Sequence, residues 1–268
     1  MTDKKPPQPQ DRERYLVPGL IRGLNVLRAF SDQNPEMGVA QIARKIDVGR
    51  STAFRLVYTL EQYGFLRKTP ETKKYRLGTK ILELGFSFLS GLEMIEISRA
   101  PLEALRDDTR TSSHLAILDG HEIVYVARYN ARERVTSNVG VGTRFPAHAT
   151  SSGRILLAGL PVAELVKLYE NVALEKYTDK TPMTLGDLIN QLDEDRKNGY
   201  VVSWGHFELH LASIAVPVRD SSGAVVASIN ISCPMTAYSR DEFDKTVLPR
   251  VIDCGLEISQ SLGYNSSR

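Results

Sequence analysis

Cysteine is scarce in this sequence of 268 residues. Its two cysteines, Cys233 and Cys254, are too few for a disulfide framework and form no CxxC pair suited to zinc or redox chemistry. Free cysteines are usually buried and behave as small apolar side chains. We therefore expect both to be reduced residues of the core.

Long apolar runs are also missing. No stretch approaches the ~18 consecutive apolar residues of a membrane-spanning helix. The first ten residues, MTDKKPPQPQ, lack the apolar segment of a secretory signal peptide. From these two absences we expect neither a membrane protein nor a secreted protein. The prediction is a cytoplasmic protein without a membrane partner.

The net charge of +2 is small, but it is unevenly distributed along the chain. Residues 1–80 contain 16 Lys and Arg against 8 Asp and Glu, a net charge of +8, whereas residues 81–268 carry −6. A basic segment followed by an acidic body favours contact between the first segment and a polyanion such as nucleic acid. A solvated basic face without a partner has the same composition, so motifs must decide.

The first eighty residues predict three short helices followed by a hairpin. Residues 1–14 are polar and lack apolar periodicity, which predicts a disordered tail. The predicted helices are Leu20–Phe30, Val39–Ile46 and Arg50–Gln62, and the predicted strands are FLRKT and KYRLG. This order predicts that residues 15–78 form a winged helix-turn-helix. In such a motif the second of its two helices, here Arg50–Gln62, enters the major groove of DNA.

Contacts with DNA are expected from the third helix and from the hairpin tip. The turn before that helix contains Gly49, where we expect a positive φ. Arg55 is the best candidate for a base contact, because a guanidinium can bridge O6 and N7 of guanine. Tyr58 is either a contact or half buried, and the lysines at the hairpin tip are either phosphate contacts or solvated turn residues. The candidate DNA-binding residues are Arg50, Ser51, Thr52, Arg55, Tyr58, Lys73, Lys74 and Arg76.

Residues 79–93 predict an apolar linker helix. Leu82, Phe86 and Phe88 belong to a dense apolar group that exceeds what a spacer needs. Such a surface packs either against another chain or against the C-terminal domain of its own chain, and the sequence leaves both alternatives open.

Residues 94–268 predict an α+β domain with an antiparallel sheet, so the fold class is α/β with two domains. SHLAILDGHEIVYVARY and ASIAVPVRDSSGAVVASINIS each place strand-forming runs around a turn. Hairpins covered by helices are typical of this architecture. The expected helices are Gly153–Leu160, Pro161–Glu170, Leu185–Asn198 and Ser239–Leu262.

Other functional classes have weaker support. Ser151 or Ser152 with His148 could form a nucleophile and base, but no GxSxG motif or suitably placed acid completes a triad. His206, Glu208 and His210 would share one face if they lay on a strand, as metal ligands or as an ordinary polar sheet face. A purely architectural DNA-binding protein without an effector is a third alternative. We expect no enzymatic activity, no cofactor and no metal.

The sequence resembles the IclR-type regulators over about residues 15–265. The N-terminal half of the resemblance lies in GLIRGLNVLRAFS, VAQIARKIDVGRSTAFRLVYTLEQYGFL and KKYRLGTKILELG. The C-terminal half lies in GTRFPAHATSSGRILLA, NGYVVSW, LASIAVPVRDSSGAVVASINIS and the CP that follows. The resemblance implies a GAF-like effector domain and a regulator that binds palindromic operators near catabolic genes.

The resemblance also implies partners. These are double-stranded DNA, a small carboxylic acid and further copies of the chain, as a homodimer or a dimer of dimers, with RNA polymerase as an additional candidate. HLASIAVPV and GVGTRFPAH resemble most the branch that controls aromatic-acid and β-ketoadipate catabolism, so an aromatic or ring-cleavage acid is expected.

The effector site implied by the resemblance consists of hydroxyl and amide side chains. Such groups, with backbone N–H groups at the start of a helix, can hold a carboxylate. Relatives often have an acidic residue or cysteine where this sequence has Ser203 and Ser213. Phe145 and Trp204 either flank an aromatic ring or belong to the core. The implied effector-binding residues are Ser151, Ser152, Ser203, Ser213, Asn230 and Ser232.

Overall fold

The computed structural model describes residues 15–131 and 139–265. The chain divides into two compact units, Met1–Gly91 and Leu92–Arg268. The tail expected at residues 1–14 lies outside the described residues. No helix in the described ranges is both long and apolar enough to cross a membrane.

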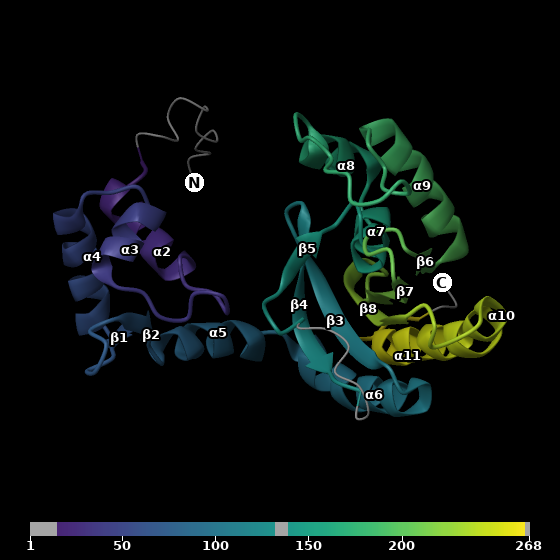
Figure 1. Ribbon diagram of the computed structural model, residues 1–268. Coiled ribbons are helices and arrows are strands. Elements are labelled where there is room, and N and C mark those ends of the chain that lie inside the picture. Colours follow the sequence, from purple (N-terminus) through teal and green to yellow (C-terminus); the bar gives the residue numbers. More distant parts are fainter. Residues whose placement is uncertain (1–14, 132–138, 266–268) are drawn as a thin grey trace, which may run out of the picture. The chain divides into compact units, whose positions relative to one another are not determined.

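The N-terminal unit is a winged helix-turn-helix, as the sequence predicted (Figure 1). Val26, Ile42, Val57 and Leu66, each at most 2% exposed, bring its three helices and the hairpin onto one core. The elements are α2 (Pro18–Arg28), α3 (Val39–Lys45), α4 (Arg50–Gln62), β1 (Leu66–Lys68), β2 (Tyr75–Leu77) and α5 (Lys80–Ser90).

Two local features of this unit differ from the prediction. The first helix begins at Pro18 rather than Leu20, because proline is well suited to the first helical turn, where its missing N–H is not needed. The expectation of a positive φ at Gly49 was wrong: Gly49 is the N-cap of α4 with a φ of −61°. Asp47 has the left-handed conformation instead, with a φ of 52°, which aspartate tolerates better than most residues.

The linker helix α5 has no buried residue within its own chain. Leu82 and Phe86 are more than 70% exposed, and Phe88 is more than half exposed. An apolar surface of this kind is typical of a helix that another protein surface covers.

The C-terminal unit is an α+β domain, also as predicted, with an antiparallel sheet of six strands in the order β5-β4-β3-β8-β7-β6. Its elements are α6 (Glu93–Thr109), β3 (Ser112–Asp119), β4 (Glu122–Tyr129), β5 (Arg144–Pro146), α7 (Ser151–Ala158), α8 (Val162–Tyr169), α9 (Leu185–Asn198), β6 (Val201–Trp204), β7 (Leu211–Arg219), β8 (Val225–Pro234), α10 (Arg240–Glu242), η1 (Phe243–Val247) and α11 (Leu248–Ser261).

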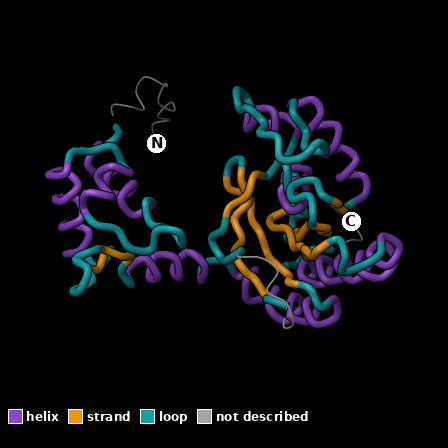
Figure 2. The backbone as a smooth tube through the Cα atoms, viewed as in Figure 1, coloured by secondary structure: helices purple, strands orange, loops and turns teal. Residues whose placement is uncertain are grey.

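Helices cover both faces of this sheet (Figures 1 and 2). The helices α6 and α11 pack on one face, where the hydroxyl of Ser113 on β3 donates to the carbonyl of Leu102 on α6. The helix α7 packs on the other face, and α9 lies against α7. All eight residues of α7 are buried, so this helix is the centre of the domain.

The helix predicted at Ser239–Leu262 is interrupted. The five residues of η1 form a π-helical turn, and the N–H of Leu248 donates to the carbonyl of Phe243. Pro249 stands at the start of α11 and has no backbone N–H, so a regular α-helical hydrogen bond is lost at this point.

Both cysteines are buried and free. Burial raises the pKa of Cys233 to about 11 and that of Cys254 to about 12. The expectation of reduced core residues is confirmed.

Candidate DNA-binding and effector-binding sites

The outer face of α4 is polar and accessible. Ala53 and Val57 turn inward and are fully buried, which leaves Ser51, Arg55 and Tyr58 exposed on the opposite side. Tyr58 is 53% exposed and stacks on Phe54 with 6.3 Å between the ring centroids. Tyr58 is therefore about half buried in the single chain and still accessible on this face.

A groove joins the start of α4 to the hairpin. Arg50, Ser51, Lys68 and Lys73 lie among the residues that line a concavity of about 500 Å³ in this unit. Lys68 was not singled out in the sequence, because it lies on the strand rather than at the hairpin tip. Its ammonium stands 5.8 Å from the ring centroid of Tyr75, which orients it by a cation–π contact.

The hairpin carries more positive than negative charge, with Glu71 as its one carboxylate. Arg67 on β1 stands directly opposite Arg76 on β2, and like charges at such positions destabilise a sheet. Lys73 and Lys74 are exposed at the turn, where Lys73 has a φ of 54°. Within the described residues none of these four cations has an ion-pair partner, so all are available to an external anion.

In the C-terminal unit the start of α7 is built from residues of the HATSSGR segment. The side chain of Thr150 caps the helix by accepting from the N–H of Gly153 at 3.2 Å. Gly153 is required here, because a Cβ at this position would lie 2.2 Å from the carbonyl oxygen of Ala147. The hydroxyl of Ser151 then meets that of Ser213 on β7 at 2.9 Å.

A row of serines crosses the sheet beneath α7. Ser203 pairs with Ser213, Ser213 pairs with Ser232, and Ser232 pairs with Ser112 on four successive strands. Directly opposed residues point to the same face of a sheet, so the four hydroxyls lie in one line. Ser112 was missed in the sequence, where it is one of several serines before an apolar strand.

A small cavity of about 70 Å³ opens above this row. Five of the six residues expected at the effector site line it, namely Ser151, Ser203, Ser213, Asn230 and Ser232. Aromatic rings form other parts of the wall. The remaining lining residues are Tyr125, Val139, Phe145, Thr150, Phe207, Glu208 and Leu211.

Two polar atoms next to the cavity form no hydrogen bond of standard geometry among the described residues, although both side chains lie close enough to the Tyr125 hydroxyl to act against its raised pKa. They are Oδ1 of Asn230, whose residue is 3% exposed, and Oγ of Ser152, whose residue is 1% exposed. Ser152 does not line the cavity, unlike its neighbour Ser151. A buried polar atom without a partner is unfavourable, which makes this part of the domain suited to a polar ligand.

Three titratable groups in or near the cavity, Tyr125, His114 and His206, are neutral at physiological pH. Burial, with a smaller effect of the charge on Glu208, raises the pKa of Tyr125 to about 12. His114 stands opposite Asn230 on β3, and burial together with the positive charge of Arg128 lowers its pKa to about 4. Burial also lowers the pKa of His206 to about 4.

Of Phe145 and Trp204, for which a place beside the ligand or in the core was left open, only Phe145 lines the cavity. The ring of Trp204 packs on Phe243 at 5.1 Å between centroids and beneath the guanidinium of Arg240. Neighbouring residues of a strand point to opposite faces, so Ser203 and Trp204 cannot both face the cavity.

The alternative of three metal ligands on a strand is contradicted. Strand β6 ends at Trp204, and Gly205, with a φ of 68°, begins a loop that contains His206, Glu208 and His210. The alternation on which that alternative depended is therefore absent. No cluster of three or more potential metal-ligating residues occurs in the described parts of the chain.

In the described residues, His148 is not placed to act as a base for a serine of α7. A ring nitrogen of His148, Nε2, lies 3.0 Å from the carbonyl of Glu175, while the hydroxyl of Ser151 is bonded to Ser213. No hydrogen bond links His148 to either serine of α7 in the residues described.

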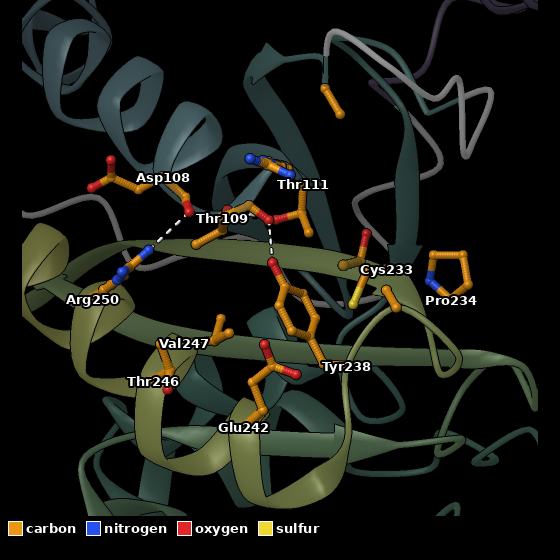
Figure 3. Close-up of a pocket in the computed structure, with 14 residues that line it drawn as sticks. Asp108, Thr109, Thr111, Cys233, Pro234, Tyr238, Glu242, Thr246, Val247 and Arg250 are labelled. Atoms are coloured by element: carbon orange, nitrogen blue, oxygen red, sulfur yellow. Dashed lines mark hydrogen bonds between the residues drawn. The ribbon is translucent and has the colours of Figure 1, made fainter.

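A second cavity of about 550 Å³ lies where α6, β8 and η1 meet (Figure 3). Tyr238 donates a hydrogen bond to the carbonyl of Thr109, and Arg250 donates to that of Asp108 at 2.8 Å. None of its described lining residues has an unpartnered buried polar atom, in contrast to the smaller cavity. These bonds hold the end of α6 against the C-terminal helices.

The N-terminal unit is a winged helix with unpaired cations, and the larger α+β unit has a buried polar cavity. This combination is typical of a transcription regulator with a separate sensor domain. Comparisons with known proteins agree. Residues 86–260 match the family described as bacterial transcriptional regulator IclR C-terminal, and residues 19–70 match the IclR helix-turn-helix domain.

Individual relatives span almost the whole chain. HTH-type transcriptional regulator XynR of Escherichia coli strain K12 is 31% identical over 93% of this chain and 98% of its own length. Pca regulon regulatory protein of Pseudomonas putida is 31% identical over 92% of this chain and 84% of its own length. The crystal structure of an IclR homolog from Microbacterium hydrocarbonoxydans, complexed with 4-hydroxybenzoate, has a TM-score of 0.78 at 25% identity and covers 91% of this chain and 98% of that chain.

The chain therefore belongs to the IclR family of bacterial transcriptional regulators. It is a DNA-binding regulator and not an enzyme, and the resemblance seen in the sequence is confirmed.

Proposed function

We propose that this protein controls a catabolic operon by binding a palindromic operator, and that an aromatic carboxylic acid bound beneath α7 regulates this binding. The observation that carries the effector part is the small cavity with its serine row, whose hydroxyls can donate hydrogen bonds to a carboxylate. Two relatives point to the same chemistry, since one regulates a Pca regulon and another was crystallised with 4-hydroxybenzoate.

In the DNA-binding part, α4 lies in the major groove and the hairpin follows the flanking phosphates. Arg55 reads a base edge from the middle of the exposed face of α4. Arg50, Lys68 and Lys73 line one groove beside the start of that helix, which supports contacts with the backbone of the same DNA segment. Ser51, Thr52 and Tyr58 complete the face, and Lys74 and Arg76 extend it along the hairpin.

A palindromic operator requires two copies of the recognition helix. The exposed apolar residues of α5, Leu82, Phe86 and Phe88, support a homodimer in which these helices are covered by a second copy. Two such dimers can pair further into a tetramer.

In the effector part, the ligand carboxylate binds the hydroxyls and amide around the start of α7. Ser151 and Asn230 stand at the wall of the cavity, and the positive end of the α7 helix dipole favours an anion there. The rings of Tyr125, Phe145 and Phe207 form apolar parts of the wall that suit an aromatic ring.

Ligand entry requires a local movement. The cavity volume of about 70 Å³ is below the roughly 150 Å³ of a cavity that binds benzene. Phe207 and Glu208 lie on the exposed loop between β6 and β7, so this loop is the part of the wall that moves outward.

The signal then reaches the linker along the chain. Ser232 of β8 pairs with Ser112 at the start of β3, and β3 follows directly after α6. The helix α6 follows the linker helix α5 after only two residues, Gly91 and Leu92. A shift of β8 on ligand binding would change the position of the linker helices and the spacing of the two recognition helices, to which operator affinity is sensitive.

A thermal unfolding screen of the full chain tests the effector part. Benzoate or a substituted benzoate at a hundredfold excess over its Kd should stabilise the protein by ~2.7 kcal/mol, whereas the uncharged benzamide should not. Asn230→Ala should abolish this stabilisation, and the matched variant Asn190→Ala on the surface of α9 should retain it. The same acid should change affinity for an operator selected from random duplex DNA. Stabilisation by no acid, or full stabilisation of Asn230→Ala, would contradict the proposal.

A further inference from the structure

Glu208 is the one charged side chain among the described residues that line the small cavity. It lies on the exposed loop between Gly205 and His210. Its carboxylate has no ion-pair or hydrogen-bond partner within the described ranges, so its hydrogen-bonding capacity is available to a ligand. The charge acts on the interior, because Glu208 contributes to the raised pKa of Tyr125.

The positive charge that would normally accompany a carboxylate ligand is missing from the described wall. No Lys, Arg or His of the described residues lines this cavity. The two nearby histidines, His114 and His206, both have a pKa lowered to about 4 and are uncharged at neutral pH. A ligand with one carboxylate can use the hydroxyls, the Asn230 amide and the start of α7. A second carboxylate would meet Glu208 with no cation among the described lining residues, since Arg128, whose charge also acts on Tyr125, does not line the cavity.

The same residue offers a favourable interaction to a different ligand group. An ionised carboxylate only accepts hydrogen bonds, and those from a neutral hydroxyl to a charged acceptor are stronger than neutral ones. A phenolic hydroxyl that reaches Glu208 is therefore bound preferentially over a hydrogen atom at the same ring position.

We infer that Glu208 determines effector class: the site takes a monocarboxylate with a hydroxyl group on its aromatic ring and rejects dicarboxylates. This inference rests on the proposed function and narrows it, because it separates aromatic hydroxy acids from ring-cleavage products that carry two or more carboxylates.

Isothermal titration of the full chain at pH 7.5 tests this assignment with three probes: benzoate, the hydroxybenzoates and terephthalate. The best hydroxybenzoate should bind roughly tenfold more tightly than benzoate, and terephthalate at least tenfold more weakly. In Glu208→Gln the best hydroxybenzoate should bind only about threefold more tightly than benzoate, or less. The affinity for terephthalate should rise about tenfold in the same variant. Glu208→Asp, which keeps the charge, should preserve the order of the three probes.

Glu164→Gln on the surface of α8 is the matched control and should leave all three affinities unchanged. Equal affinities for benzoate and the hydroxybenzoates, or an unchanged order of probes in Glu208→Gln, would overturn the role of Glu208 and leave the proposed function in place. Binding of none of the three probes to the unmodified protein would instead overturn the proposed function, and the role of Glu208 with it.

Discussion

The two units use their polar residues in opposite ways. In the N-terminal unit the cations of α4 and the hairpin are exposed and unpaired, and Arg67 even faces Arg76 across the sheet. In the C-terminal unit the important polar groups are buried under α7, and the guanidinium of Arg154 forms two hydrogen bonds, of 2.8 and 2.5 Å, with the carboxylate of Asp195.

The difference reflects the ligand that each unit is proposed to bind. A polyanion in solvent is attracted by accessible cations, which need little internal support. A small acid inside a protein must find hydrogen-bonding groups that are already desolvated and held in place by their neighbours. Substitutions should therefore disturb stability mainly in the C-terminal unit and affinity mainly in the N-terminal unit.

The largest expected effect comes from the buried ion pair. Arg154→Met leaves the Asp195 carboxylate buried without its partner, which should lower the free energy of unfolding by about 3–5 kcal/mol. Lys80→Met removes an exposed ion pair with Glu83 in α5 and should cost less than about 1 kcal/mol. Urea denaturation followed by circular dichroism and by the fluorescence of Trp204 measures both. Equal losses of unfolding free energy in the two variants would contradict the distinction between the units. The double variant Arg154→Met with Asp195→Leu should recover most of the stability lost in Arg154→Met.

An intermediate effect is expected from pH. His114 is neutral in the folded protein with a pKa of about 4, whereas an unfolded histidine has a pKa of about 6.5. As the pH falls from 7 to 5 the unfolded chain gains a proton that the folded chain does not, so stability should decrease by about 2 kcal/mol from this residue. The Trp204 signal in urea at the two pH values measures the loss. His114→Gln should reduce the pH dependence, and an unchanged dependence would show that His114 does not cause it.

The smallest effect is expected at the hairpin tip. Lys74→Gln removes one phosphate contact, so it should weaken binding to all duplexes alike and lower the slope of log K against log salt concentration by about 0.9.

Arg55→Ala should instead weaken binding to a selected operator more than binding to random duplex DNA, by ~1–3 kcal/mol. Fluorescence anisotropy at several salt concentrations distinguishes the two. Equal loss on both duplexes for Arg55→Ala would reassign that residue to the phosphates.

The spacing of apolar residues along the sequence was sufficient to predict helices in both units. The predicted bounds of α4 and α9 agree with the structure, because an apolar stripe at helical spacing identifies each helix. The conditional alternative of three aligned polar residues on a strand is excluded by one backbone conformation. Gly205 ends β6 and moves His206 and Glu208 into a loop, and nothing in the alternation of the following residues indicates this.

The sequence by itself determined the order of elements, the basic N-terminal unit and its exposed helix, because these depend on residues close together in the chain. Only the tertiary structure aligned Ser112, Ser203, Ser213 and Ser232 in one row. Strand pairing brings together residues that are up to 120 positions apart, and the register of each pair fixes which hydroxyls share a face. The cavity and the position of Glu208 at its wall follow from that register and from the packing of α7.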